Sequence, residues 1–432
     1  MPLRLFRCAF ACLTAASAAF ALTAVPAAAD SNQNEFDDTN LHQMSAKFGG
    51  AVPLEDAHTI RHWSGRTTDP VDGITYRYNM VGVDPRSNRS ATIGVDIIPV
   101  NVTVATPVGA ATFNGADNVD GVLQSPLFTN GNYTSTTGAT NATGGQGDGG
   151  GLSKGNDDVQ LLDATMRAQF NKVGTGYHLL LAPKVRPAIT INVPAGLGRV
   201  ARSPHPLHPV FAFVENDWFK ATVKDQVHAL HLNPSRLAVF LTTNVVLFIV
   251  DKTTGTTTCC VIGAHGADDL STTQSGSDEN SSGNNDDGRQ QVHTFVWSSW
   301  LSVGYSLSKW AIQDIHGLSH EIVEWATNPF TNNTVQSYRP PLSPPTSTCQ
   351  NLLETGDPVV GIGFSQGTNH FFQNPLYTDG TYHPEDAVFL PWFIRTSPNT
   401  ISQPAQNSAG GRYTFMGDLN PFSSFHQPPG TC

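Results

Sequence analysis

Charged residues are scarce in this chain, and glutamate is especially rare. Only 14% of the 432 residues are Asp, Glu, Lys or Arg, and glutamate occurs just eight times. Glycine and proline are plentiful by contrast, with 39 and 29 copies. This composition excludes a largely helical protein and is typical of a loop-rich chain built on strands.

Basic residues are few, and two of them belong to a predicted export signal. Residues 1–29 carry Arg4 and Arg7, then an apolar run, then Ala27-Ala28-Ala29, the pattern of a secretory signal with its cleavage site. Removing it leaves 22 basic and 35 acidic residues, a net charge near −13. We therefore expect a secreted protein, extracellular or periplasmic, without affinity for nucleic acid or anionic membranes.

Long hydrophobic runs are also missing after the signal. The most apolar stretch of the mature chain, residues 237–250, is interrupted by Thr242, Thr243 and Asn244. A membrane helix needs roughly 18 or more consecutive apolar residues. The stretch therefore predicts a buried strand or strand pair, and we expect no membrane span.

Cysteine is rare, and the mature chain keeps only Cys259, Cys260, Cys349 and Cys432. An even number in an exported protein favours two disulfides. Because neighbouring cysteines rarely bond to each other without strain, we expect Cys259 and Cys260 each to pair with Cys349 or Cys432, in either combination. No Cys-x-x-Cys spacing occurs in the mature chain, which argues against a thiolate metal site.

The order of predicted elements indicates an α+β fold. Alternating or β-branched runs predict strands at 73–81, 91–104, 177–181, 188–193 and 210–214, the first two joined as a hairpin. Apolar periodicity predicts helices at 158–173 and 217–230. We expect a β-rich N-terminal part, 30–128, packed as one compact unit on a mixed α/β part, 158–432, with a Gly/Ser/Thr/Asn-rich loop at 129–157.

A helix predicted at residues 314–329 is the central feature of the second part. Its apolar residues recur at three- and four-residue steps and form one stripe: Ile315, Leu318, Ile322 and Trp325. Asp314 is the expected N-cap. Asn328-Pro329 ends the helix, because a residue before proline is pushed out of the helical region.

The opposite face of this helix predicts a metal site. His316, His320 and Glu324 lie one helical turn apart, and Glu321 lies beside His320, which gives the motif His-Glu-x-x-Glu. Ligands four residues apart converge on one ion, and the intervening Glu321 can then act as general base on a water at that ion. With so few glutamates, a chance occurrence of the motif is expected only on the order of a few thousandths of a time.

Two downstream carboxylates are candidates for the third ligand. Glu354 and Asp357 follow His320 by 34 and 37 residues, a distance at which a returning segment can complete the site. We favour Asp357 slightly, although Gly356-Asp357-Pro358 is also an ordinary turn. The expected ion is Zn²⁺, and another divalent ion is the alternative.

Three other interpretations remain open. In the first, the polar face of the helix is simply solvated and binds no metal. In the second, its carboxylates pair with arginines such as Arg339 and Arg395. Alternatively, Gly363–Gly367 is a nucleophile elbow around Ser365, which requires a strand before it and a helix after it.

Several segments together resemble a family of uncharacterised exported microbial proteins. Those segments are 62–65, 80–85, 125–128, 259–266, 319–325, 353–358 and 390–393. More distantly, the order of motifs is similar to plant phosphate-induced, EXORDIUM-like proteins and to zincin-type metallopeptidases. The resemblance implies a zincin-like helix and a carboxylate-rich site to which His265 contributes. This chain has Ala264 where the close family is expected to have tyrosine.

These features predict a secreted zinc-dependent hydrolase, most readily a peptidase. His320 and Glu324 hold the metal together with Asp357 or Glu354, Glu321 is the catalytic base, and His316 and His265 are accessory. The alternative is a non-catalytic surface or wall-associated protein that binds glycans and keeps the helix for structure. Aromatic residues such as Trp392, Phe393 and Tyr382 are candidates for stacking on sugars in that case.

Overall fold

The structure is a computed structural model that describes residues 51, 54, 56–131, 133, 158–269, 290–305, 312–341, 349–372, 378–396, 413–415, 429–430 and 432. The predicted signal at 1–29 and residues 134–157 of the predicted loop lie outside the described residues. Among the described helices, none has the length and apolar character needed to cross a membrane.

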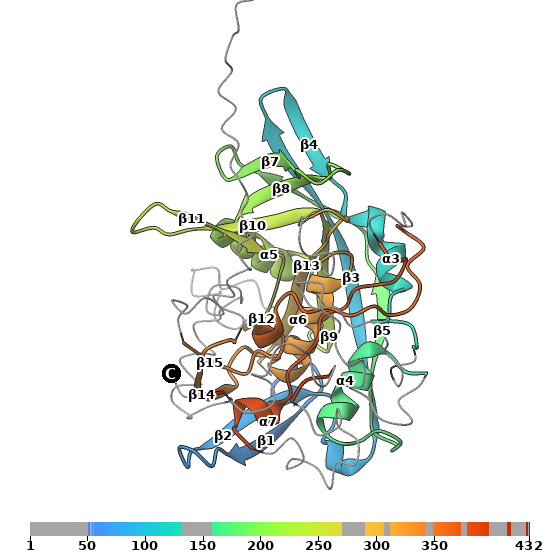
Figure 1. Cartoon of the computed structure of the whole chain (residues 1–432), viewed down its shortest axis with the longest axis vertical. Helices are drawn as coiled ribbons and strands as arrows, with labels where there is room; N and C mark the ends of the chain where they lie inside the picture. Colours follow the sequence, from blue (N-terminus) through green and yellow to red (C-terminus); the bar gives the residue numbers. More distant parts are fainter. Residues whose placement is uncertain are drawn as a thin grey trace, which may run out of the picture.

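A seven-stranded sheet runs through the molecule in the order β12-β13-β9-β3-β4, with β5 and β6 also paired to β3 (Figure 1). Its strands are β3 (Ser90–Thr106), β4 (Gly109–Phe113), β5 (His178–Val185), β6 (Ile189–Val193), β9 (Arg236–Thr243), β12 (Gly263–Asp269) and β13 (Val292–Trp300). β3 pairs in parallel with β5, β6 and β9, and β9 with β13. The N-terminal and C-terminal parts of the chain therefore share one sheet, and the predicted α+β class is confirmed.

The predicted hairpin between residues 73–81 and 91–104 is wrong. β2 (Thr75–Val81) instead pairs antiparallel with β1 (His62–Thr68). β3 is buried along most of its 17 residues. A strand buried on both faces is suited to the interior of a sheet, where parallel partners cover both of its edges.

A smaller sheet has the order β11-β10-β8-β7, and the helix α5 (Asn216–Ala229) packs against it. Its strands are β7 (Gly198–Arg202), β8 (Val210–Glu215), β10 (Val245–Val250) and β11 (Thr257–Val261). The apolar run at 237–250 thus forms two strands in two different sheets. The break falls at Asn244, whose positive φ of 53° is the left-handed conformation that asparagine tolerates.

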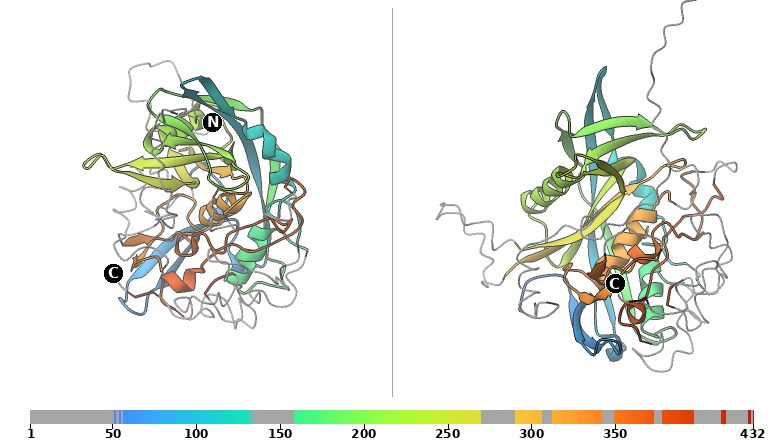
Figure 2. Two further views of the ribbon diagram at one scale, coloured as in Figure 1. Left: turned by 45° about the horizontal axis from the view of Figure 1, so that its top comes forward. Right: turned by 60° about the vertical axis from the view of Figure 1, so that its left-hand side comes forward.

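α6 (His316–Thr327) crosses the face of the large sheet near the centre of the molecule (Figures 1 and 2). It packs against β12 and β13, and Nε1 of Trp325 donates to Oγ1 of Thr294 at 3.0 Å. Every residue of the predicted apolar stripe is buried. The remaining short elements are α3 (Val119–Leu123), α4 (Leu161–Gln169), which also contacts α6, α7 (Leu390–Phe393), β14 (Thr334–Tyr338) and β15 (Gln350–Leu352).

The predicted N-cap is one residue too early. Ile315 caps α6, while Asp314 has a φ of 43° and accepts from the backbone N–H of Ile315 at 2.6 Å. The Asp314 carboxylate is held instead by His383, whose Nδ1 lies 2.7 Å from its Oδ2. Residues 378–386 are thereby fixed against the start of the helix.

Because of this contact, we expect the stability of the protein to fall in alkaline solution. Burial lowers the pKa of His383, but the carboxylates of Asp314 and Asp379 more than offset it and raise the pKa to about 9. A folded-state pKa above the unfolded value near 6.5 gives stability that is complete below about pH 6.5 and is lost as the pH rises through 9. This pKa shift corresponds to roughly 3 kcal/mol of unfolding free energy. Urea unfolding at pH 6, 8 and 10 measures the free energy of unfolding. His383→Gln should remove the loss of stability between about pH 6.5 and 9. If the variant loses stability over this range as wild type does, His383 is not its source.

The predicted disulfide pairing is also wrong. Cys259 and Cys260 are bonded to each other through a cis peptide unit, and Cys349 is bonded to Cys432. The first two cysteines lie on β11 at the edge of the smaller sheet, whereas Cys349 adjoins β15 in a separate two-stranded sheet. The two pairs therefore belong to different parts of the fold.

The fold does not support two of the alternative sites, the aromatic sugar-binding platform and the nucleophile elbow. Trp392, Phe393 and Tyr382 are almost fully buried, so they form core rather than a sugar-binding platform. Gly363 and Gln366, on either side of Ser365, make isolated bridges to the segment 382–385, and no helix begins among the described residues 364–372. The arrangement is not a nucleophile elbow.

Candidate metal centre

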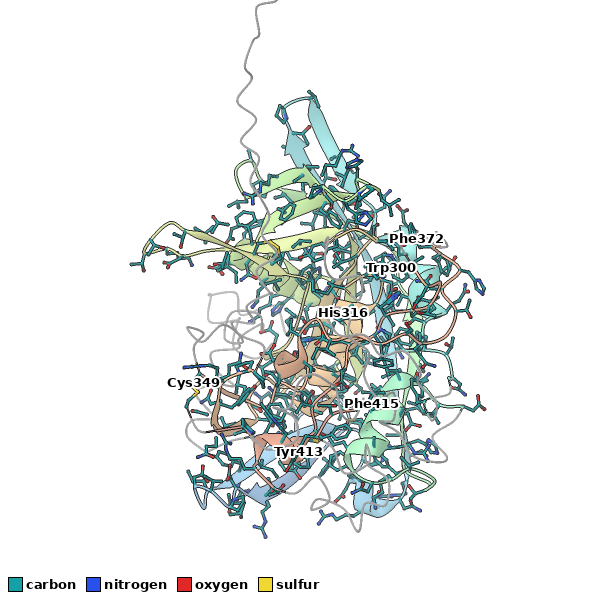
Figure 3. All side chains as sticks on the ribbon, viewed as in Figure 1. Trp300, His316, Cys349, Phe372, Tyr413 and Phe415 are labelled. Carbon is teal, nitrogen blue, oxygen red and sulfur yellow. A yellow bond between two sulfur atoms is a disulfide. The ribbon has the colours of Figure 1, made fainter. Side chains whose placement is uncertain are left out.

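Three segments bring the predicted site residues together: α6, β12 and the residues that follow β15. Two groups of side chains have potential ligand atoms within 4.8 Å of one another. We call His320, Glu324 and Asp357 the His320 cluster, and His265, Glu321 and Glu324 the His265 cluster. The two clusters share Glu324. In Figure 3, His316 of the same helix lies in the middle of the molecule.

In the His320 cluster, both α6 ligands face the segment after β15. Nε2 of His320 lies 3.0 Å from Oε2 of Glu324 and 3.9 Å from Oδ1 of Asp357. Oε1 of Glu324 accepts from the backbone N–H groups of Gly356 and Asp357 at 2.9 and 3.0 Å. These two bonds fix the position of Asp357 relative to the helix.

The other oxygen of Glu324, Oε2, is the candidate metal-binding atom of this side chain. Oε2 is buried and accepts no well-aligned hydrogen bond from any residue that the structure describes, although Nε2 of His320 is close to it. Two ligands of one ion have this relation, because each lone pair is directed at the ion rather than at the other ligand.

Glu385 is a functional candidate that the sequence analysis missed. Its Oε1 lies 2.7 Å from Nδ1 of His320, and its Oε2 lies 2.6 Å from Nε2 of His316. A carboxylate on the second nitrogen of a metal-binding histidine fixes the ring and its tautomer. His316, predicted as an accessory ligand, belongs to neither cluster and contacts Glu385 instead.

The buried histidine and carboxylates of the cluster shift each other's pKa values. Burial lowers the pKa of His320, but Glu324 and Glu385 more than offset it and hold that pKa well above its usual value. Burial raises the pKa of Glu324, and His320 outweighs this effect and lowers it. A cation bound by His320 and Glu324 would compete with the proton on His320.

The His265 cluster lies on the side of α6 that faces the sheet. His265 is on β12, and its Nδ1 lies 3.4 Å from Oε2 of Glu321 and 3.7 Å from Oε2 of Glu324. Glu354 is on the opposite edge of the ring, with its Oε2 3.7 Å from Nε2. Its Oε1 accepts from Nδ2 of Asn328 at 2.6 Å. The structure thus brings Asp357, and not Glu354, to His320.

The two interpretations without a metal do not fit this geometry. Glu324 is 0% exposed and His316 only 1%, so the polar face of α6 is not solvated. Arg395 pairs with Asp69 at 3.4 Å, and Arg339 is exposed. The partners described for the Glu324 carboxylate are histidines and backbone N–H groups.

Gly356 allows the close approach on which the His320 cluster depends. A Cβ atom at this position would lie 2.4 Å from Nδ1 of His320. We expect Gly356→Ala to displace the imidazole and to weaken metal binding by about 10- to 100-fold, the usual effect of disturbing a ligand's support. Isothermal titration with Zn²⁺ measures this change. Gly430→Ala, where the added Cβ would meet no atom within 4 Å, is the control and should bind Zn²⁺ like wild type. Gly380→Ala would not serve, because the positive φ of Gly380 disfavours any side chain. A Gly356→Ala protein with wild-type affinity would contradict the assignment.

Comparison of the chain with protein-family models, with curated proteins and with solved structures finds no match. The resemblances to exported microbial proteins, to EXORDIUM-like proteins and to zincins therefore stay predictions. The function must be argued from the metal centre itself.

Proposed function

We propose that the protein is an exported metal-dependent hydrolase whose ion is held by the His320 cluster. The observation that carries this proposal is the convergence of His320, Glu324 and Asp357, with Oε2 of Glu324 buried and only 3.0 Å from Nε2 of His320. Three protein ligands on a tetrahedral ion leave one position open, as in catalytic zinc sites.

The chemistry follows from the groups around that position. A bound Zn²⁺ supplies a Lewis acid for a substrate carbonyl. Glu321 is the candidate general base, because its Oε1 lies 3.9 Å from Nε2 of His320. His320 is the most exposed of the three ligands, with 12% of its side chain accessible, so a substrate would approach from its side.

Peptide bonds are the substrate class to test first, because a Glu directly after the first helix ligand is typical of metallopeptidases. We expect the purified mature protein to cleave a mixed library of fluorogenic peptides. Chelation that removes the metal should lower the rate more than 10-fold, and added Zn²⁺ should restore it. Unchanged cleavage by protein with less than a tenth of its metal would contradict the proposal.

A structural role for the metal is the second candidate, favoured by the burial of the centre. Only His320 of the His320 cluster is more than slightly exposed, and the cluster joins α6 to the segment after β15. In that case metal removal lowers the melting temperature, because a ligand that binds only the folded state stabilises it, but no hydrolysis is seen in any form of the protein. This role suits an exported surface or wall-associated protein.

A further inference from the structure

We propose that the centre takes two divalent cations, one in each cluster, with the carboxylate of Glu324 between them. This inference rests on the proposed function, because it assumes that the His320 cluster binds the first ion. It adds a second binding position, made by His265 and Glu321 together with Glu324.

The orientation of His265 is the first argument. Its Nε2 lies 3.2 Å from the carbonyl oxygen of Asn328, which can only accept a hydrogen bond. Oε2 of Glu354, a second oxygen without a proton to donate when ionised, lies 3.7 Å from the same nitrogen. Nε2 is therefore the nitrogen that donates to Asn328, and Nδ1 is the nitrogen that faces the carboxylates of Glu321 and Glu324. Nδ1 and the two carboxylates thus converge on one point, the arrangement that a cation with one nitrogen and two oxygen ligands requires.

The spacing of these atoms is the second argument. Ligand atoms at 2.0 to 2.1 Å from a tetrahedral ion lie about 3.4 Å apart. Nδ1 of His265 is 3.4 Å from Oε2 of Glu321 and 3.7 Å from Oε2 of Glu324. The side chains thus need only small shifts to bind an ion.

One ion cannot serve both clusters. Nitrogen ligands of a single ion lie at most about 4.2 Å apart, twice the bond length. His265 and His320 each form a cluster with Glu324, in which all ligand atoms lie within 4.8 Å of one another. Neither cluster contains both histidines, so their ligand nitrogens do not meet this distance and are too far apart for one ion. Two separate positions therefore share one carboxylate.

Glu324 is placed to bridge these positions. Its Oε1 is used by the N–H groups of Gly356 and Asp357, which leaves Oε2 facing Nε2 of His320 on one side and Nδ1 of His265 on the other. Glu324 is fully buried, and Oε2 accepts no aligned hydrogen bond from the described residues. An oxygen shared by two cations would account for this arrangement.

Charge supports the second cation and limits its chemical class. The three carboxylates of the clusters, Glu321, Glu324 and Asp357, carry a formal charge of −3 when ionised, more than one divalent cation neutralises. Each cluster offers one imidazole and two carboxylates. This mixture suits Zn²⁺, Mn²⁺ or Fe²⁺ rather than Ca²⁺ or Mg²⁺, whose ligands are mostly oxygen.

The stoichiometry of metal binding tests this inference. The metal-free full-length mature protein is dialysed against Zn²⁺, and the bound metal is measured by elemental analysis. We expect two ions per chain for wild type, one for His265→Asn and one for Asp357→Asn, each of which removes a ligand of only one cluster. His228→Asn, a substitution at a histidine of α5 that pairs with Asp268, is the matched control and should keep two.

The outcomes separate the two proposals. One ion in wild type, unchanged in His265→Asn, overturns the second site and leaves the proposed function intact; no ion overturns both. If His265→Asn does not fold, the wild-type protein loaded with Mn²⁺ decides the question. Two ions at the roughly 4 Å spacing of two-metal sites give an exchange-coupled electron paramagnetic resonance spectrum, whereas the six-line spectrum of isolated Mn²⁺ would overturn the inference.

Discussion

Glu324→Gln should abolish metal binding, with the metal content of the purified protein falling to less than about a tenth of the wild-type value. The amide oxygen of the glutamine can still accept from the N–H groups of Gly356 and Asp357, at the position that Oε1 now occupies. Its NH₂ group would then face Nε2 of His320 and donate to it. The substitution replaces a ligand with a donor while it keeps the buried hydrogen bonds, so the fold should survive.

Elemental analysis and circular dichroism of the variant together measure this effect. Glu215→Gln is the matched control, because Glu215 caps α5 through the N–H of Trp218 and lies in neither cluster. The control should keep its full metal content. A folded Glu324→Gln protein that still holds as much metal as wild type would show that the shared carboxylate is not a ligand.

Glu321→Gln should lose hydrolysis while the His320 cluster keeps its ion. A general base contributes about 10²- to 10⁴-fold to the rate, and an amide cannot accept the proton. Glu321 packs tightly against β12, since a Cβ on Gly263 would lie 2.5 Å from its Oε1. Glutamine has the same shape and should fit this space.

The rate of peptide cleavage is compared with the His320 cluster of both proteins loaded, because Glu321 is also a proposed ligand of the second ion and its loss lowers the total metal content. Glu215→Gln again serves as the control and should cleave at the wild-type rate. If Glu321→Gln cleaves as fast as wild type under these conditions, Glu321 is not the base, and the structural role of the metal becomes the better account.

Periodicity identified the elements that form the core of the site. The apolar stripe of α6 is buried against the large sheet, and the strands β3, β5, β6 and β8 lie close to the stretches that alternation or β-branching predicted. The spacing of His320 and Glu324 follows from the helical repeat alone. These features depend on neighbours in sequence, and sequence patterns report such neighbours directly.

The rest of the centre depends on contacts between distant segments. Glu385 belongs to an irregular stretch without periodicity, and contacts of this stretch with α6 hold it at His320: His383 pairs with Asp314, and the N–H of Glu385 donates to Oγ of Ser319. The place of His265 depends on the pairing of β12 with β13. The resemblance to known families implied a role for His265, but no spacing rule connects it to α6.

The metal content of the purified mature protein, after incubation with Zn²⁺ and dialysis, tests the central claim most directly. The account predicts at least one tightly bound ion per chain and one ion fewer in His320→Ala, since that substitution removes the histidine of the His320 cluster. A wild-type protein that is folded and binds no Zn²⁺, Mn²⁺ or Fe²⁺ would contradict the account, because the buried carboxylates around α6 would then have to be neutralised by protons alone.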